Sequence, residues 1–392
     1  MSRIRSAMCA VSVLSLLAVS REALAIDARS VGMGNTGTSF VDSGAAIYFN
    51  PALMQQTESY AATLALGGAS AVAQGPVDGP KTSVSSSSAP APLFLAGAQY
   101  RLSDRFVVGL ALYPTLGIGA DYKNVTSLQG GELKTTAVAL EASPAVSFAI
   151  TKDLSVAVGY RTTYAMLDTV QSTPSQKQET SVSGTNWLGL QVGAFYRPIP
   201  ALRLGLQYRA QVTDDLSGNT TTTGSAPQPT TSQLSIPHSL RGGAALSLLD
   251  DTLLLAVEGQ WTNFSSSWQK LVVVEQQPNT APSTSTEVLN WVDAYLLQVG
   301  AEYRVHPMVP LRVGYEIERS QVSSQSAYYF FPPPGVIQAV HVGAGLILPH
   351  LNVDLGGYYE FGGQEDDVTK QGNPGYYGLK GIAVVLSATL HG

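Results

Sequence analysis

Several long stretches of this chain alternate apolar residues with small or polar ones at a period of two. In residues 201–209, for example, Leu202, Leu204 and Leu206 share one face. Side chains two residues apart project from the same face of a β-strand, so this pattern predicts strands with one apolar face. The same pattern occurs in residues 153–161, 295–304 and 311–318. A chain dominated by such strands is constrained to an all-β fold that keeps those faces out of water.

The segments that join these strands alternate strictly between short and long. Residues 103–104 and 198–200 are short connections, whereas residues 73–90 and 214–232 are long and of low complexity. Outer-membrane barrels have short periplasmic turns and long outer loops, and their strand number is even. Six short and seven long connections imply fourteen strands. We therefore expect a fourteen-stranded antiparallel transmembrane β-barrel over residues 58–392.

A soluble β-sandwich would give the same alternation with its apolar faces turned inward. The tyrosines favour the membrane, because amphipathic rings concentrate at membrane interfaces and many tyrosines of this chain fall at expected strand ends. They are Tyr100, Tyr160, Tyr196, Tyr208, Tyr303, Tyr358 and Tyr359. With a net charge of -6, the chain offers no basic surface for nucleic acid, so we expect no such partner.

The first 25 residues have the features of a secretory signal peptide. Arg3 and Arg5 form its positive region, residues 11–19 are apolar, and Ala23-Leu24-Ala25 is a small-residue cleavage site. The only cysteine, Cys9, lies within this signal, so we expect no disulfide, thiolate nucleophile or cysteine-bound metal in the mature chain. Export and a barrel together predict the outer membrane of a Gram-negative bacterium, crossed many times.

Residues 26–57, between the signal and the first expected strand, are rich in glycine, alanine and serine. They are too polar to span a bilayer and too small to build a core, so we expect a hatch that plugs the barrel lumen. Within it, Asn50-Pro51-Ala52 would hold the hatch against the inner wall, because asparagine bonds backbone groups and proline restricts its neighbour.

Charged residues on the polar faces of the strands would point into the lumen. We expect them to pair with one another and with the hatch, because unpaired buried charge is costly. They are Arg161, Arg203, Arg209, Glu258, Glu302, Arg304, Arg312, Glu316, Glu318 and Asp354.

Pro114 lies inside the third expected strand and is followed by Gly117 and Gly119. Proline cannot donate to a strand ladder and a closed barrel has no free edge, so this strand must kink, bulge or separate from a neighbour. A bulge without a role in transport is the plain alternative.

Four consecutive aromatic residues fall in an expected outer loop. They are Tyr328, Tyr329, Phe330 and Phe331. An exposed apolar patch often marks a binding site, so they could form a landing surface for a hydrophobic substrate. The alternative is a cluster packed against neighbouring loops.

The order and spacing of several motifs resemble the FadL family of outer-membrane transporters for long-chain fatty acids and other hydrophobic compounds. The motifs are Gly32-Met33-Gly34, Asn50-Pro51-Ala52, and residues 236–243, 257–265 and 311–315. The resemblance implies a fourteen-stranded barrel with the hatch inside. It also implies a lateral gap where the third strand kinks inward, and Pro114 lies at that position. No Arg or Lys matches the family's carboxylate-binding positions, which leaves both substrate classes open.

These observations predict a channel for passive uptake of fatty acids or other hydrophobic compounds, such as aromatic hydrocarbons. Uptake would proceed by capture at the outer loops, passage gated by the hatch, and lateral exit at the third strand. Its other expected partners are outer-membrane lipid, lipopolysaccharide and the barrel assembly machinery. A scaffold or secretion accessory of the same shape is the alternative, because fold does not fix function.

We expect neither enzymatic activity nor a cofactor. His238 and Ser239 are adjacent, so in a strand they point to opposite faces and cannot act as a pair. The five histidines show no metal-ligand spacing, so no metal site is expected either.

Overall fold

The computed structural model describes residues 27–392 apart from 88–90, 277–281 and 367–373. The expected signal peptide lies outside the described residues. The described chain contains nineteen strand segments, all in one antiparallel sheet. They are β1 (Tyr60–Gly75), β2 (Val84–Ser85), β3 (Ala91–Arg101), β4 (Phe106–Val125), β5 (Gly131–Ala149), β6 (Leu154–Ser172), β7 (Lys177–Ile199), β8 (Leu202–Arg209), β9 (Val212–Thr222), β10 (Gln228–Ile236), β11 (Ser239–Leu248), β12 (Leu253–Thr262), β13 (Lys270–Glu275), β14 (Ser283–Val288), β15 (Ala294–His306), β16 (Val309–Arg319), β17 (Val336–Ile347), β18 (Leu351–Asp366) and β19 (Gly375–His391).

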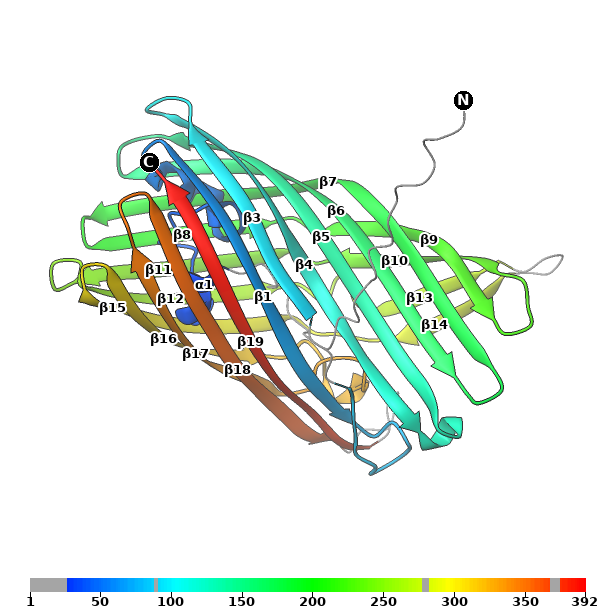
Figure 1. The fold of residues 1–392 in the computed structure, drawn as a ribbon. Coiled ribbons are helices and arrows are strands. Elements are labelled where there is room, and N and C mark those ends of the chain that lie inside the picture. The colour runs from blue at the N-terminus through cyan, green and yellow to red at the C-terminus, as the bar shows by residue number, and fades with distance from the viewer. Residues whose placement is uncertain (1–26, 88–90, 277–281, 367–373) are drawn as a thin grey trace, which may run out of the picture.

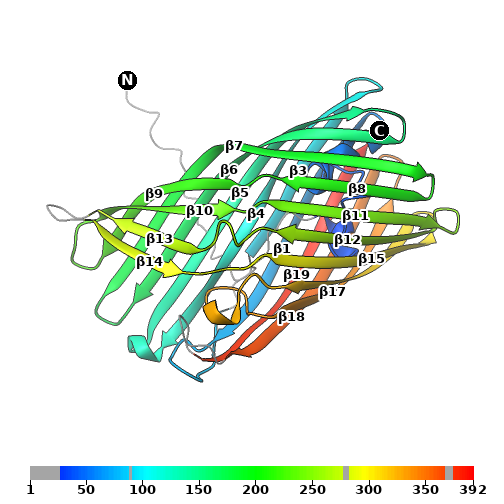
Figure 2. The same cartoon turned by 180° about the vertical axis from the view of Figure 1, so that it is seen from behind.

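The sheet closes into a barrel of fourteen strands. β1 pairs with β19 from Ala61–His391 to Gln74–Gly378, which joins the first strand to the last. Four strands are interrupted, so that β8 with β9, β10 with β11, β12 with β13 and β14 with β15 each form one strand in two pieces. With these pieces joined and the two-residue β2 set aside, the predicted fourteen-stranded barrel is confirmed. Figures 1 and 2 show the strands tilted around a long cylinder.

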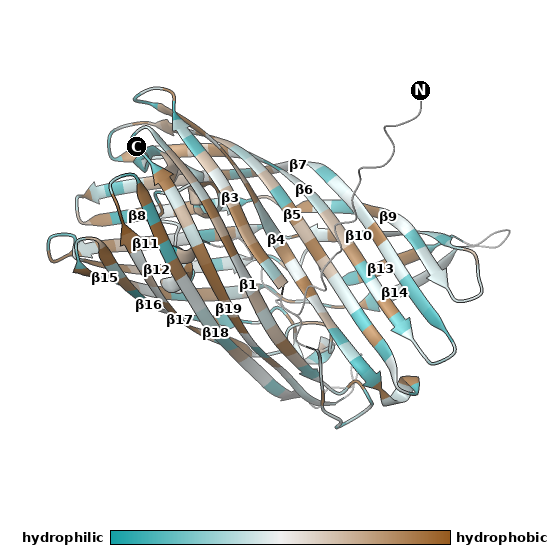
Figure 3. Cartoon of the chain, in the orientation of Figure 1, coloured by the Kyte–Doolittle hydropathy of each residue, from teal (hydrophilic) through white to brown (hydrophobic). Residues whose placement is uncertain are grey.

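The apolar face of the strands points outward, as a membrane barrel requires. The side chain of Val313 is 59% exposed and that of Leu204 is 37% exposed, whereas Arg161 in the lumen is 0% exposed. The soluble sandwich would have buried these aliphatic side chains against each other. In Figure 3, brown is frequent along the ribbons of β3, β18 and β19, and teal is frequent on those of β13 and β14. Within the described residues, no helix is both long enough and apolar enough to span a bilayer.

The strand ends at the C-terminal side of the barrel are joined by short turns of two to four residues, as expected. At the other end, the expectation of uniformly long loops is partly wrong. β6 and β7 are joined by residues 173–176, and β9 and β10 by residues 223–227, because these strands extend into the stretches expected to be loops. Hydroxyls bind across the extension: Thr220 lies 2.8 Å from Thr180 and 2.9 Å from Thr230. β-branched threonines favour extended backbone, which explains why the low-complexity sequence forms strands here.

The hatch lies inside the barrel at the end where the C-terminus lies (Figure 1). It comprises α1 (Ala28–Gly32), α2 (Ala46–Phe49) and the 3₁₀-helix η1 (Pro51–Gln56). Asp27 caps α1, and Asn50 caps η1 with Pro51 at its first position, as helix starts favour. α1 contacts β16–β19 and η1 contacts β4–β7, so the hatch spans the lumen from one wall to the other. Two further 3₁₀-helices lie in connections of the barrel, η2 (Thr126–Leu128) and η3 (Ser324–Ser326).

Charges of the wall pair with one another and with the hatch, as expected. Glu302 lies 2.9 Å from Arg29 of the hatch and 2.6 Å from Arg312, and Arg312 lies 2.7 Å from Asp354. Glu258 accepts from two hatch amides, those of Gly37 and Thr38. Arg203 and Arg304 differ, because both are only half-buried near the short turns.

Candidate functional site

Asn50 fixes the hatch to the wall through its side chain. Its amide nitrogen donates to the carbonyl of Ala194 in β7 at 2.9 Å and to that of Thr38 at 3.0 Å. Its amide oxygen accepts from the backbone N–H of Ala52 at 3.1 Å. The Asn50 side chain is buried, so each lost bond would leave an unsatisfied polar atom. The approach requires Gly193 on β7, where an added Cβ would lie 2.2 Å from the Asn50 amide oxygen.

The wall separates between β3 and β4. Their pairing runs from Arg101–Val107 to Ala96–Leu112 and, within the described residues, ends there. β3 continues alongside β1, and β4 continues alongside β5 with a bulge between Pro114 and Leu116. The last paired residue of β4, Leu112, therefore lies just before Pro114. In Figure 1, β3 ends halfway along the barrel while β4 runs on behind it.

Beyond this point β4 leaves the lipid-facing surface. Leu110 and Leu112 are exposed on the outside, but every residue from 113 to 122 is buried. The separation is filled by apolar side chains. Leu93 and Leu95 of β3 belong to the same hydrophobic cluster as Tyr113 and Tyr122 of β4.

A buried ion cluster holds β4 at the bend. The Tyr113 hydroxyl donates to the carboxylate of Glu141 on β5. Arg161 binds the same carboxylate at 2.8 Å, and Arg209 binds it at 2.7 Å. Tyr48 of the hatch packs edge-on against Tyr113, with ring centroids 5.0 Å apart. The bend, the neighbouring wall strands and the hatch thus meet at one carboxylate.

An apolar pocket of about 150 Å³ lies on the lumen side of the bent strand. β4 contributes Ile118, β6 contributes Leu167, and the loop between β16 and β17 contributes aromatic rings. The lining residues are Ile118, Thr135, Ala137, Leu167, Thr169, Leu234, Trp268, Leu271, Glu287, Tyr328, Phe330 and Phe331. A cavity of about 150 Å³ with aliphatic and aromatic walls can hold one benzene ring.

Two interruptions of the wall each contribute a tryptophan, and one of the two, Trp268, lines this pocket. Residues 263–269 separate β12 from β13, and residues 289–293 separate β14 from β15. Trp268 and Trp291, one from each interruption, are buried and stacked with ring centroids 4.6 Å apart. The ring of Phe331 meets Trp291 edge-on at 5.0 Å. The sequence predicts continuous strands across both positions, which is wrong. The run Asn263-Phe264-Ser265-Ser266-Ser267 was the signal that could have shown the first break.

The family model for "Outer membrane protein transport protein (OMPP1/FadL/TodX)" matches residues 16–381 of this sequence. The chain belongs to this family. The predicted resemblance and the outer-membrane location are thereby confirmed.

Solved structures of FadL-family proteins share the fold. A Pseudomonas aeruginosa FadL homologue is 17% identical with a TM-score of 0.79, and the alignment covers 96% of this chain and 99% of that one. The Ralstonia pickettii toluene transporter TbuX is 16% identical with a TM-score of 0.73, covering 94% and 98%. The P. putida toluene transporter TodX is 15% identical with a TM-score of 0.71, covering 94% and 99%. A search of curated proteins found no match.

The four aromatics expected on an exposed outer loop are not an exposed patch in this FadL-family barrel. Phe330 is buried, and Tyr328, Tyr329 and Phe331 are half-buried. The Tyr122 hydroxyl donates to the Tyr329 carbonyl at 2.6 Å, which holds the loop down inside the lumen. These rings pack among themselves and against the wall, which is the alternative arrangement expected from the sequence, and their contact with substrate stays a prediction.

Gly119, after the bend, lies close to the backbone of the neighbouring strand, and a role of Gly117 and Gly119 in a lateral opening stays a prediction. At Gly119, an added Cβ would lie 2.3 Å from the backbone oxygen of Thr135 on β5. A side chain there would disrupt the wall itself. Gly117 lies on the same buried stretch of β4.

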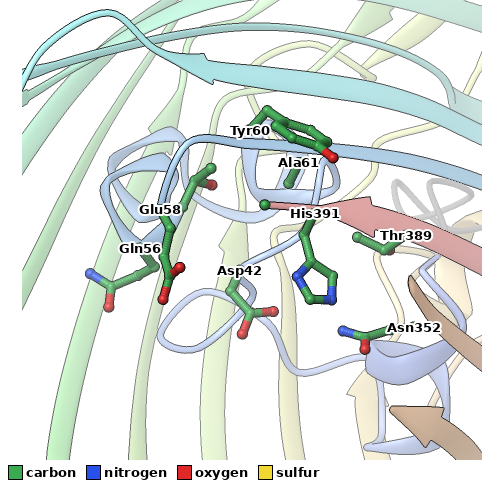
Figure 4. Close-up of a pocket in the computed structure, with 10 residues that line it drawn as sticks. Asp42, Gln56, Glu58, Tyr60, Ala61, Asn352, Thr389 and His391 are labelled. Atoms are coloured by element: carbon green, nitrogen blue, oxygen red, sulfur yellow. The ribbon is translucent and has the colours of Figure 1, made fainter. Parts of the chain in front are cut away.

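A second cavity, the rim cavity, opens at the C-terminal end of the barrel. It has a volume of about 190 Å³ and lies between the hatch, the start of β1 and the end of β19. Figure 4 shows the carboxylates of Asp42 and Glu58 and the ring of His391 around it. These polar groups suit water and not a hydrocarbon.

Proposed function

We propose that this protein is a passive channel for small hydrophobic compounds of about one aromatic ring, without chemical conversion. Ligand enters the apolar pocket from the outer end of the lumen. It leaves sideways into the membrane between β3 and β4. The observation that carries the proposal is that this separation adjoins the pocket on β4.

The pocket and the separation are connected by apolar side chains. Ile118, which lines the pocket, follows the bend by four residues. Phe330 also lines the pocket, and it belongs to the hydrophobic cluster that contains Leu93 and Leu95 at the separation. Its ring lies 6.0 Å from that of Tyr122. Apolar side chains therefore extend from the pocket to the separation, where a hydrophobic ligand could leave. The periplasmic end, in contrast, presents the polar rim cavity and the charged hatch.

Size and charge favour a ring over a long-chain fatty acid. The pocket volume suits one ring. Its described lining holds no arginine or lysine that could bind a carboxylate. The names of two similar structures, both toluene transporters, agree with this choice. The hatch would gate passage by its contacts with the wall, and lipid and lipopolysaccharide would surround the outward apolar face.

Uptake of labelled toluene and of a labelled long-chain fatty acid, by cells with and without the protein, tests the proposal. We expect faster toluene uptake with the protein present and a smaller effect on the fatty acid. If neither rate depends on the protein, the scaffold or secretion-accessory alternative replaces transport.

The variant Ala137→Phe tests the pocket itself. Ala137 is buried on the lumen side of β5, and a phenyl ring there would fill a space suited to one ring. We expect toluene uptake to fall about tenfold, because losing most of the pocket removes at least about 1.4 kcal/mol of binding. Val146→Phe, on the lipid-facing side of the same strand, is the matched control. Equal uptake by the two variants would remove this pocket from the route.

A further inference from the structure

A polar vestibule of about 310 Å³ lies next to the apolar pocket. The two cavities share six lining residues, so they adjoin each other. The shared residues are Thr135, Thr169, Leu271, Glu287, Tyr328 and Phe330. The vestibule is also lined by Lys134 and Glu275, and both signs of charge are therefore present at the entrance.

Glu287 is the one charged residue in the described lining of the apolar pocket. It lies on β14 and is half-buried. Among the residues that the structure describes, no ion pair or hydrogen bond joins its carboxylate to a partner. Burying a carboxylate without a partner is costly. At the edge of an apolar pocket, this carboxylate can instead interact with a bound ligand.

Aromatic side chains line the same pocket as this carboxylate. Trp268, Tyr328, Phe330 and Phe331 line the same cavity. Aromatic faces attract organic cations, and the attraction grows when water is excluded. A carboxylate beside them adds charge-assisted hydrogen bonds to an ammonium group and repels another carboxylate.

We propose that Glu287 selects ligands by charge, so that the pocket prefers an aromatic ring bearing a protonated amine and rejects one bearing a carboxylate. This inference rests on the proposed function of the pocket as the ligand site. It places the ring of an arylalkylamine among the aromatic residues, with its ammonium group at the boundary with the vestibule. The same carboxylate discourages fatty-acid anions.

The test compares three probes with the same ring: toluene, 2-phenylethylammonium and phenylacetate. Binding to the purified full-length protein in lipid nanodiscs is measured at neutral pH and low salt, by equilibrium dialysis of the labelled probes. The variants are Glu287→Gln and Glu287→Lys. Glu275→Gln, which changes a vestibule carboxylate outside the apolar pocket, is the matched control.

We expect the wild-type protein to bind the ammonium probe at least about tenfold more tightly than phenylacetate, as one charge-assisted hydrogen bond provides. Glu287→Gln should remove most of that preference, and Glu287→Lys should reverse it. The control should keep it, and toluene binding should change little in every variant.

Two results overturn the inference. One is equal affinity of the wild-type protein for the two charged probes, and the other is an unchanged preference in Glu287→Gln. Absence of toluene binding in the wild-type protein would instead contradict the proposed function, so the two failures are distinguishable.

Discussion

Asp27 shows how a single buried carboxyl can make hatch docking depend on pH. It accepts hydrogen bonds from the backbone N–H and the hydroxyl of Ser30, each at 3.2 Å. Burial, followed by the charge of the neighbouring Asp354, raises the pKa of Asp27 to about 6, while Ser30, Arg29 and Arg312 act in the opposite direction. The Ser387 hydroxyl also faces it, at 3.5 Å.

Because the folded pKa of Asp27 is raised, its contribution to stability is fully present below the unfolded value of 3.8 and is lost as the pH rises through about 6. The loss amounts to about 3 kcal/mol, or about a hundredfold in the opening equilibrium of the hatch. We expect hydrogen exchange in α1, corrected for its intrinsic pH dependence, to accelerate over this range. Asp27→Asn should abolish the acceleration, because asparagine accepts the same bonds and does not ionise.

Asp42→Asn is the control for this prediction, because Asp42 is an exposed carboxylate of the same hatch. It should leave the pH dependence as in the wild-type protein. A wild-type hatch whose exchange is flat between pH 4 and 7 would contradict the role of Asp27.

Residue-level prediction succeeded where local chemistry decided the outcome. The Asn-Pro-Ala run predicts a residue that binds backbone groups, and Asn50 does so on both hatch and wall. His341 shows the limit, because its sequence neighbours give no partner. In the folded chain its Nδ1 lies 2.8 Å from the carbonyl of Val31 in α1, a contact that only the closed barrel creates.

At the level of single elements, the sequence predicts that β4 is disturbed but not how far it separates from β3. Pro114 predicts a disturbance, since proline removes a ladder donor. The length of the separation depends instead on β3, which follows β1 and not β4 beyond Ala96. Pro144 of β5 lies where the β5–β6 register is interrupted, and its pairing with Leu110 of β4 is intact.

The separation itself can be tested on β3. Leu93 is buried in the cluster that fills it, and the neighbouring Phe94 projects from the opposite face of the strand. We expect Leu93→Trp to slow toluene uptake about tenfold while leaving equilibrium binding to the pocket unchanged, because only the exit is narrowed. Phe94→Trp should have no effect on either quantity. A Leu93→Trp protein with normal uptake and an intact, heat-modifiable barrel would rule out exit at this position.

For the molecule as a whole, the alternation of side chains was enough to predict closure and the polar lumen. A period of two fixes which side chains face lipid, and the charges left inside must then find partners. The aromatic side chains that point into the lumen at the outer end of the barrel could not be predicted in this way. Trp268 and Phe330 line the pocket, and Trp291 stacks on Trp268. All three come from breaks in strands or from a long connection, where no periodicity constrains the direction of side chains.

The hatch and the bent strand should respond to each other, because they share the cluster around Glu141. Tyr48 of the hatch packs on Tyr113, and the guanidinium of Arg209 lies 5.4 Å from the Tyr48 ring centroid and 5.8 Å from that of Tyr113. Truncating a buried aromatic residue lowers the free energy of unfolding by about 3–5 kcal/mol, and part of this loss comes from the side chains that packed against it. We therefore expect Tyr48→Ala to accelerate hydrogen exchange in residues 113–122 of β4 by at least about tenfold, as a loss of about 1.4 kcal/mol would. Phe40→Ala removes another buried hatch aromatic, one that packs on Arg29 and not on Tyr113, and should leave this stretch protected. If both variants accelerate hydrogen exchange in β4 equally, the effect is a general loss of hatch packing. If neither variant does, the hatch does not control the bend, and lateral exit proceeds independently of the hatch.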